Sequence, residues 1–125
     1  MCVLSWNVRG LGSQIKHKAI KSLLRKQRVE MTFLVDPKLE LVSDDVVKSI
    51  WWTDVFRYEF VPSLGSSGGI LVIWEHTKFD LMGICHDPNF LRLRGTWCLE
   101  AWECDMVTVY APWASEAQAD LVDVP

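Results

Sequence analysis

At 125 residues, of which 50% are hydrophobic and 23% charged, the chain has the composition of one globular domain, which excludes disordered and fibrous classes. No apolar run approaches the ~18 residues of a membrane span, and the start lacks a basic leader and a cleavage site, so we expect an intracellular protein (nucleus or cytoplasm) without membrane contact. The formal net charge is -3, yet the stretch from Arg9 to Arg28 is basic and contains no acid.

The start of the chain predicts a strand, a helix and a second strand. Residues 2–8 are apolar and rich in β-forming side chains, and the loop at residues 9–12 ends them. Residues 31–35 form the second buried strand, and this order predicts a parallel or mixed neighbouring pair. Between the strands, Ser13 can cap a helix that runs to about Arg28, with apolar residues at helical spacing: Ile15, Ala19, Ile20, Leu23 and Leu24.

The remainder of the chain predicts mostly strands. A short helix is expected to begin after Ser43, which can cap it. Residues 56–62 and 70–74 are expected to pair as a hairpin around the glycine-rich turn at 65–69. Further strands are predicted at residues 79–85, 96–103 and 106–110, and a helix can begin at residue 114.

The aromatic and cysteine contents bear on the core. Seven tryptophans and five phenylalanines require a large core, because each such ring buries ~150–250 Å². In so short a chain this aromatic content indicates that a packing partner is missing, so we expect poor solubility. The cysteines lack metal-ligand spacing and are expected to be reduced, with a disulfide or a zinc site as the less favoured alternative: Cys2, Cys85, Cys98 and Cys104.

Two polar residues end the first two predicted strands. Asn7 and Asp36 each lie at the carboxyl end of a buried strand, and the intervening helix makes these strands neighbours, so two oxygen ligands can converge. Mg²⁺ prefers oxygen ligands and takes only one or two carboxylates from protein, which suits this arrangement. The alternative, which spacing alone favours, is that Asn7 closes a turn and Asp36 enters a loop before Pro37.

The acid-free basic stretch suggests two roles. A basic helix attracts nucleic-acid phosphates through counterion release, and the candidate contacts are Arg9, Lys18, Lys21 and Arg25. The charges alone favour the alternative, a solvated helix face without a ligand.

A series of short motifs follows the chain in a fixed order. They are Ser5-Trp6-Asn7-Val8-Arg9-Gly10-Leu11-Gly12, Lys18-Ala19-Ile20-Lys21, Phe33-Leu34, the segment from Pro62 to Trp74, and Val109-Tyr110-Ala111-Pro112. In order and spacing they resemble the endonuclease/exonuclease/phosphatase superfamily, in particular the endonuclease domain of plant LINE-type retrotransposons. The resemblance covers most of residues 3–113. It implies the amino-terminal half of a deoxyribonuclease I-like domain, a partial four-layer α/β sandwich in residues 1–113, followed by a divergent tail in residues 114–125.

The resemblance assigns roles to three residues. The asparagine matching Asn7 helps to hold a Mg²⁺ ion in that family, and the tyrosine matching Tyr110 lies against the substrate phosphate, where a phenol can donate to developing negative charge. The family's metal-binding glutamate, in a Gln-Glu-Thr-Lys motif, is replaced here by Asp36. Aspartate is shorter by about 1.5 Å, which is large against the ~2.0–2.1 Å bonds of Mg²⁺. Pro37 restricts this position further, so we expect low metal affinity.

The family's later motifs, Asp-x-Asn and Asp-His, are absent from this sequence. No histidine replaces the catalytic one by motif. His17 lies in the basic helix, and exposed or capping roles are expected for His76 and His86, which lie near predicted strand ends. In-line attack on a phosphate needs a base and charge stabilisation together. We therefore interpret the chain as a truncated, inactive relative of a Mg²⁺-dependent endonuclease. DNA is its candidate partner, and no obligate protein partner is expected. Two alternatives stay open: a non-catalytic nucleic-acid-binding remnant that uses helix 16–28, and a gene-model fragment without selected function.

Overall fold

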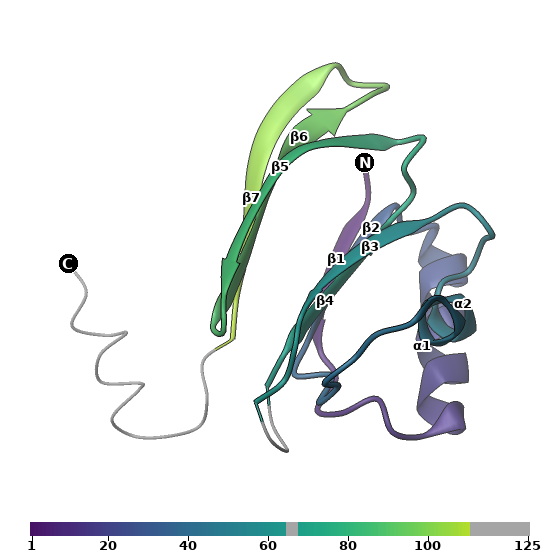
Figure 1. Cartoon of the computed structure of the whole chain (residues 1–125). Helices are drawn as coiled ribbons and strands as arrows, with labels where there is room; N and C mark the ends of the chain where they lie inside the picture. The colour runs from purple at the N-terminus through teal and green to yellow at the C-terminus, as the bar shows by residue number, and fades with distance from the viewer. Residues whose placement is uncertain (65–67, 111–125) are drawn as a thin grey trace.

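The computed structural model describes residues 1–64 and 68–110, which form two helices and two sheets (Figure 1). The helices are α1 (Gln14–Gln27) and α2 (Asp44–Ile50). The strands are β1 (Val3–Asn7), β2 (Met31–Val35), β3 (Arg57–Val61), β4 (Ile70–Trp74), β5 (Phe79–Asp87), β6 (Phe90–Trp97) and β7 (Trp102–Val109). The helix and tail predicted from residue 114 lie outside the described residues, as do residues 65–67 of the predicted turn.

The elements stack in three layers. The first sheet has the strand order β1-β2-β4-β3, with β1 and β2 parallel and the other neighbours antiparallel. Both helices cover one face of this sheet, and the second sheet, an antiparallel β5-β6-β7 meander, lies over the other face (Figure 1). The α/β class, the parallel first pair and the β3–β4 hairpin pairing confirm the predictions. A fourth layer does not occur among the described residues.

Two hydrophobic cores hold these layers together. The core between the helices and the first sheet includes Ile20, Leu24, Val47, Ile50, Trp51 and Leu71. The core between the two sheets includes Phe33, Val72, Trp74, Phe79, Leu91 and Trp97. Because β2 and β4 lie between both cores, they are buried on both faces, which explains their nearly continuous apolar sequences.

Helix α1 has the predicted ends but a different buried face. The Ser13 hydroxyl accepts the N–H of Lys16 at 3.1 Å, and Arg28 ends the helix with a φ of 52°. Ile15, which was predicted to pack in the core, is 82% exposed, and Ala19 is exposed as well. The buried face is formed by His17, Ile20 and Leu24.

His17, which the sequence places in the basic helix, is a buried structural residue. Its Nε2 lies 2.6 Å from the carbonyl oxygen of Leu11, and its Nδ1 lies 2.9 Å from the hydroxyl of Ser49. Since a carbonyl can only accept, the Nε2 atom carries a proton. His17 therefore joins the loop after β1 to α2 through α1.

The second sheet differs from the prediction at its middle strand. β6 begins at Phe90, and the strand predicted at residues 96–103 is the end of β6, a turn and the start of β7. The turn lies between Trp97 and Trp102 and contains neither glycine nor proline. Ala101 adopts a positive φ of 51° there, which is uncommon for a residue with a Cβ.

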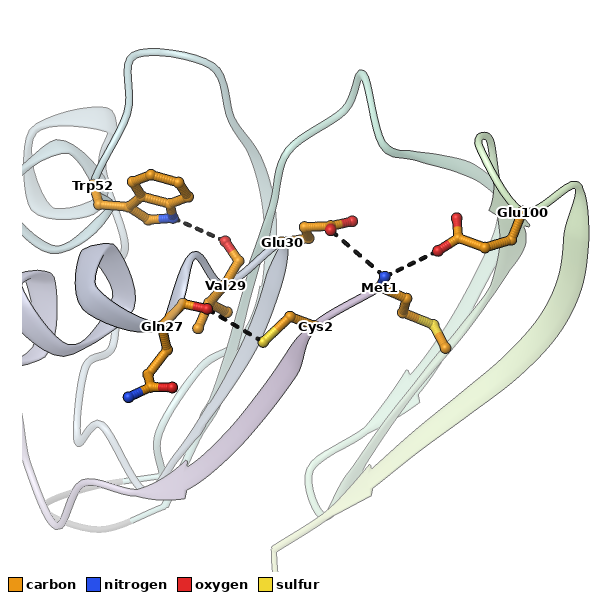
Figure 2. A network of polar contacts seen from close by, with 7 residues as sticks. All are labelled: Met1, Cys2, Gln27, Val29, Glu30, Trp52 and Glu100. Carbon is orange, nitrogen blue, oxygen red and sulfur yellow. Dashed lines mark hydrogen bonds and ion pairs between the residues drawn. The ribbon is translucent and has the colours of Figure 1, made fainter.

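A polar network joins the start of the chain to both sheets (Figure 2). The amino group of Met1 forms ion pairs with Glu100 at 2.9 Å and with Glu30 at 3.6 Å. Glu30 precedes β2 and Glu100 lies in the β6–β7 turn, so one cation links the two sheets. Nearby, the indole N–H of Trp52 donates to the carbonyl of Val29 at 2.8 Å (Figure 2). The hydrogen bond with Glu100 is the main cause of the raised pKa of the Met1 amino group.

The four cysteines are free thiols. Within residues 1–64 and 68–110, no helix has the length and apolar character needed to cross a membrane.

Candidate functional site

The candidate site lies at the carboxyl ends of β1 and β2. Asn7 ends β1 and pairs in register with Val35, the last residue of β2, so Asp36 lies one position beyond this pair. The pairing continues past the strands, because the N–H of Val8 donates to the Val35 carbonyl at 2.9 Å and that of Gly10 to the Asp36 carbonyl at 2.7 Å. The two candidate metal ligands therefore lie on adjacent segments at one edge of the first sheet.

Asp36 uses its side chain to hold the start of β4. Its Oδ1 atom accepts the N–H of Gly68 at 2.8 Å, and only 9% of the residue is exposed. The Asp36 N–H donates to the carbonyl of Gly69, and the Lys38 N–H donates to the carbonyl of Gly68, both at 3.1 Å. One carboxylate oxygen is thus already engaged in a buried structural hydrogen bond.

Asn7 has a local role of its own. Its Oδ1 atom accepts the N–H of Arg9 at 3.2 Å, and the side chain is otherwise exposed. An asparagine that accepts from the backbone two residues on forms an Asx-turn. Both members of the candidate pair therefore show the turn and loop roles that sequence spacing alone favours.

Positive φ angles are concentrated at this edge of the sheet. Positive φ is uncommon for residues other than glycine, and such strain is frequent at functional sites. Away from this edge, Arg28 and Ala101 are the described residues with positive φ. At the edge, the residues are Arg9 (52°), Gly10 (98°), Asp36 (58°), Lys38 (59°), Gly68 (89°) and Gly69 (88°).

Tyr110 packs against Gly68, the residue whose N–H binds Asp36. The tyrosine is half-buried, and its N–H donates to the carbonyl of Asn89 at 2.8 Å. A Cβ added to Gly68 would come within 3.2 Å of the Tyr110 ring, so this ring packs directly on the glycine backbone. The structure thus brings Asp36 and Tyr110 together through Gly68, a residue to which the sequence analysis assigned only a place in a turn.

Lys16 is a second residue whose role the sequence analysis missed. Its ammonium group donates to the carbonyls of Val8 and Gly10, each at 2.8 Å, and it is partly buried. This lysine therefore fixes the loop that follows Asn7, although the sequence groups it with the surface charges of the basic stretch.

The other basic residues of α1 face solvent or make weak contacts. Lys18 and Arg25 are exposed, as is Arg9 in the loop before the helix. Lys21 is half-buried, and its ammonium group donates to the carbonyl of Lys48 at 3.2 Å. In the part of the chain that the structure describes, no ion pair involves a basic residue of α1. The positive charge of this helix is therefore not compensated by neighbouring acids.

The donor set at the strand ends is small for a metal ion. Asp36 supplies one carboxylate whose Oδ1 already binds the Gly68 N–H, and Asn7 supplies an amide oxygen. Residues 1–64 and 68–110 contain no group of three or more His, Cys, Asp or Glu side chains positioned for a metal. Mg²⁺ would thus depend on water and substrate for most of its ligands.

An open pocket of about 650 Å³ lies away from the strand ends, between α2, β3 and β5. In its wall the hydroxyl of Tyr58 donates to Asp44 Oδ1 at 2.7 Å. This hydrogen bond is the main cause of the raised pKa of Tyr58. The other ionisable groups of the pocket are of both signs and include Lys48, Asp54, Arg57, Glu59 and Asp80. None of the metal-binding, phosphate-contacting or nucleic-acid-binding residues proposed from the sequence lines it.

Comparison with known proteins supports the fold. No protein-family model matches the chain, and no curated protein matches it. Among solved structures, it is similar to the crystal structure of the AP endonuclease LMAP from Leishmania major, with a TM-score of 0.64 at 13% sequence identity. The match covers 86% of this chain and 39% of that one. The chain therefore has a nuclease-like fold and spans well under half the length of the structure that it matches.

Proposed function

We propose that this chain is an inactive relative of Mg²⁺-dependent phosphodiesterases that hydrolyse nucleic acids, with Asn7 and Asp36 as residual metal ligands and Tyr110 as a former phosphate contact. The nuclease-like fold and the ordered motifs around Asn7 and Tyr110 support this proposal. A retroelement origin, which those motifs suggest, is part of it. The observation that carries the proposed inactivity is the hydrogen bond between the Asp36 carboxylate and the Gly68 N–H.

Asp36 is poorly suited to bind a metal tightly. A carboxylate that is buried and bonded to a backbone N–H must reorient or share its oxygen before it can ligate Mg²⁺, and that ion demands near-ideal geometry. Asp36 also follows β2 with a positive φ and precedes Pro37, so its backbone has little freedom to adjust. We expect a Mg²⁺ affinity far below that of a working nuclease site.

A histidine positioned for water activation is also missing near the strand ends in the described residues. His17 uses both ring nitrogens in structural hydrogen bonds. His76 follows β4 at the end of the sheet opposite Asp36, because Trp74 pairs with Met31 at the start of β2. His86 lies on β5, and β6 separates it from β7 and Tyr110. Attack in line with a phosphate requires a base or a water-positioning group in the site.

Incubation of the purified chain with Mg²⁺ and either supercoiled plasmid or a duplex containing an abasic site tests this proposal. We expect no nicking beyond that given by an Asn7→Ala variant purified in the same way, which controls for contaminating nucleases. Cleavage by the wild type that Asn7→Ala abolishes would contradict the proposed inactivity. A Mg²⁺ titration followed by calorimetry, with Asp36→Asn as the control, measures the residual affinity directly.

A second candidate function is non-catalytic nucleic-acid binding through α1. The uncompensated positive charge of this helix favours it, since Lys18 and Arg25 are exposed and no acid pairs with them in the described residues. Arg9 and Lys21 would extend the same surface. Contacts to phosphates release counterions, so affinity should fall steeply with salt.

Fluorescence anisotropy with a labelled DNA duplex at several salt concentrations tests this second function. A variant with Lys18→Gln, Lys21→Gln and Arg25→Gln should bind more weakly and show a shallower dependence of log K on log salt. Arg94→Gln removes an exposed positive charge from the second sheet and is the matched control. Equal binding by the triple variant and the wild type would show that α1 is a solvated face.

A further inference from the structure

The outer edge of β7 is the most open strand edge in the described part of the chain. β7 is the last strand of its sheet there, and it pairs with β6 over its whole length without a register shift. Its side chains include Trp102, Val107 and Val109, which are 51%, 58% and 52% exposed. A long, regular edge with exposed apolar side chains is a template for pairing with another strand.

The other sheet edges carry features that discourage pairing. β5 has a register shift between Leu81 and Gly83, and such bulges disturb edge pairing. β3 presents Arg57 and Glu59, and β1 is only 5 residues long. β7 has no lysine, proline or bulge, and its charged residues are two acids in its first half, Glu103 and Asp105.

We propose that two copies of this chain associate through antiparallel pairing of their β7 strands, about a two-fold axis at Met106. This register places Glu103 opposite Val109 of the second copy and Asp105 opposite Val107. Each acid then faces an apolar residue, and residues 103–109 of both copies pair. The proposal does not rest on the proposed function, because pairing of β7 needs neither a metal at Asn7 and Asp36 nor a phosphate contact at Tyr110.

The charge pattern of β7 selects this register. In an antiparallel pair, residues directly opposite each other project from the same face of the sheet. The two-fold axis between the two β7 strands therefore passes through a residue rather than between two residues. An axis at Cys104 would place Glu103 opposite Asp105, and an axis at Asp105 would place this residue opposite itself. Like charges directly opposite are destabilising. An axis at Val107 avoids this conflict but pairs only residues 105–109, whereas the axis at Met106 pairs residues 103–109.

The space beside β7 also fits a second β7 strand. Across the sheets β2 lies against β7, and β1, one strand further out, leaves Val3 41% exposed on the face toward the second sheet. Open grooves of about 380 and 460 Å³ follow β7 between the sheets. Trp97 lines the larger groove, and its buried indole N–H has no hydrogen-bond partner in residues 1–64 and 68–110. The β7 strand of a second copy would lie over Val3 and bring backbone carbonyls to this region.

Light scattering after gel filtration, over a range of concentrations, measures the association. We expect a mass that rises from 14.4 kDa toward twice that value. Val107→Lys should give a monomer with unchanged circular dichroism, whereas Glu59→Lys on the edge of β3 should still dimerise. A wild type that stays monomeric, or a Val107→Lys variant that still dimerises, would overturn the proposal.

Disulfide trapping tests the register. In a background with Cys85→Ser, Cys98→Ser and Cys104→Ser, we expect Met106→Cys to form a covalent dimer under mild oxidation. Val107→Cys is the matched control and should remain monomeric on denaturing gels, because its counterpart in this register is Asp105. Trapping by Val107→Cys but not by Met106→Cys would overturn the proposed axis.

Discussion

The carboxylate of Asp36 accepts the backbone N–H of Gly68 at 2.8 Å, across 32 positions of sequence. This bond, together with the Asp36 N–H bond to the carbonyl of Gly69, ties the end of β2 to the start of β4. Gly68 also packs against the ring of Tyr110. The residue that best matches a metal ligand by position is therefore also the residue that organises this edge of the fold.

Loss of the Asp36 side chain should destabilise the protein. Asp36→Ala is expected to lower the free energy of unfolding by about 1–3 kcal/mol, because the Gly68 N–H would be left buried without an acceptor. Asp36→Asn keeps an oxygen acceptor and tolerates the positive φ, so its loss should be smaller. Urea unfolding followed by tryptophan fluorescence measures both. Equal losses in the two variants would contradict the structural role assigned to the acceptor.

Lys16 and Lys18 should behave differently although the sequence presents them alike. Lys16→Met removes two hydrogen bonds from a partly buried ammonium group to the carbonyls of Val8 and Gly10 and should cost about 1–3 kcal/mol of unfolding free energy. Lys18→Met changes an exposed residue, so its effect should stay within about 0.5 kcal/mol. Thermal unfolding of both variants at one pH checks this difference, and equal melting temperatures would refute it.

Local signals predicted much of the fold, and longer-range packing accounts for the misses. Ser13 and Ser43 are helix caps as predicted, because capping depends on residues within one turn. Ile15 fits a helical period but is exposed, since the packing of α1 against Ser49 and Leu11 favours the face that carries His17.

The sequence analysis missed most of β6, although its side chains alternate as in a half-buried strand, because no residue type marks where it ends. Leu91 and Leu93 are buried and alternate with the exposed Arg92 and Arg94, which is the period of a half-buried strand. The following turn contains no glycine or proline, and its positive φ lies at Ala101, so no residue type signals where the strand ends. A prediction that relies on turn residues therefore joins the end of β6 to the start of β7.

The sequence predicts where the two candidate metal ligands lie, but not that the Asp36 carboxylate is already engaged in a hydrogen bond. That Asn7 and Asp36 end neighbouring parallel strands follows from the strand, helix, strand order and is confirmed. That Gly68 occupies the Asp36 carboxylate depends on where β4 enters the sheet, which nothing near Asp36 in the sequence encodes. The metal and phosphate roles of these residues remain proposals that rest on the motifs.

Two glycines of the second sheet should differ sharply in their tolerance of a methyl group. A Cβ on Gly95 would overlap the carbonyl of Asp80 and the ring of Phe79, so Gly95→Ala should destabilise by about 1–3 kcal/mol through overpacking. A Cβ on Gly83 meets nothing within 4 Å, and Gly83→Ala should leave stability unchanged or raise it by about 0.5 kcal/mol. Urea unfolding of the two variants tests the placement of β5 against β6, and a tolerated Gly95→Ala would contradict it.

Tyr58 should ionise at higher pH than an ordinary tyrosine. Its hydroxyl donates to Asp44 Oδ1, and this bond is the first cause of its raised pKa, followed by burial and by the negative charges of Asp44 and Glu59. The bond needs the protonated phenol, so its contribution to stability is complete below the pKa of the unfolded chain, near 10.0, and is lost as pH rises through the higher pKa of the folded state.

Ultraviolet titration of a Tyr110→Phe variant isolates Tyr58, because the chain has 2 tyrosines. We expect the phenolate absorbance to appear at higher pH than in the urea-unfolded variant. Adding Asp44→Asn removes the charge and should shift the transition toward that of the unfolded chain, while Asp45→Asn, which changes the neighbouring acid, should leave it in place. A transition that Asp44→Asn does not move would exclude the negative charge of Asp44 as a cause of the raised pKa, since asparagine keeps an oxygen acceptor and leaves the desolvation of the phenol unchanged.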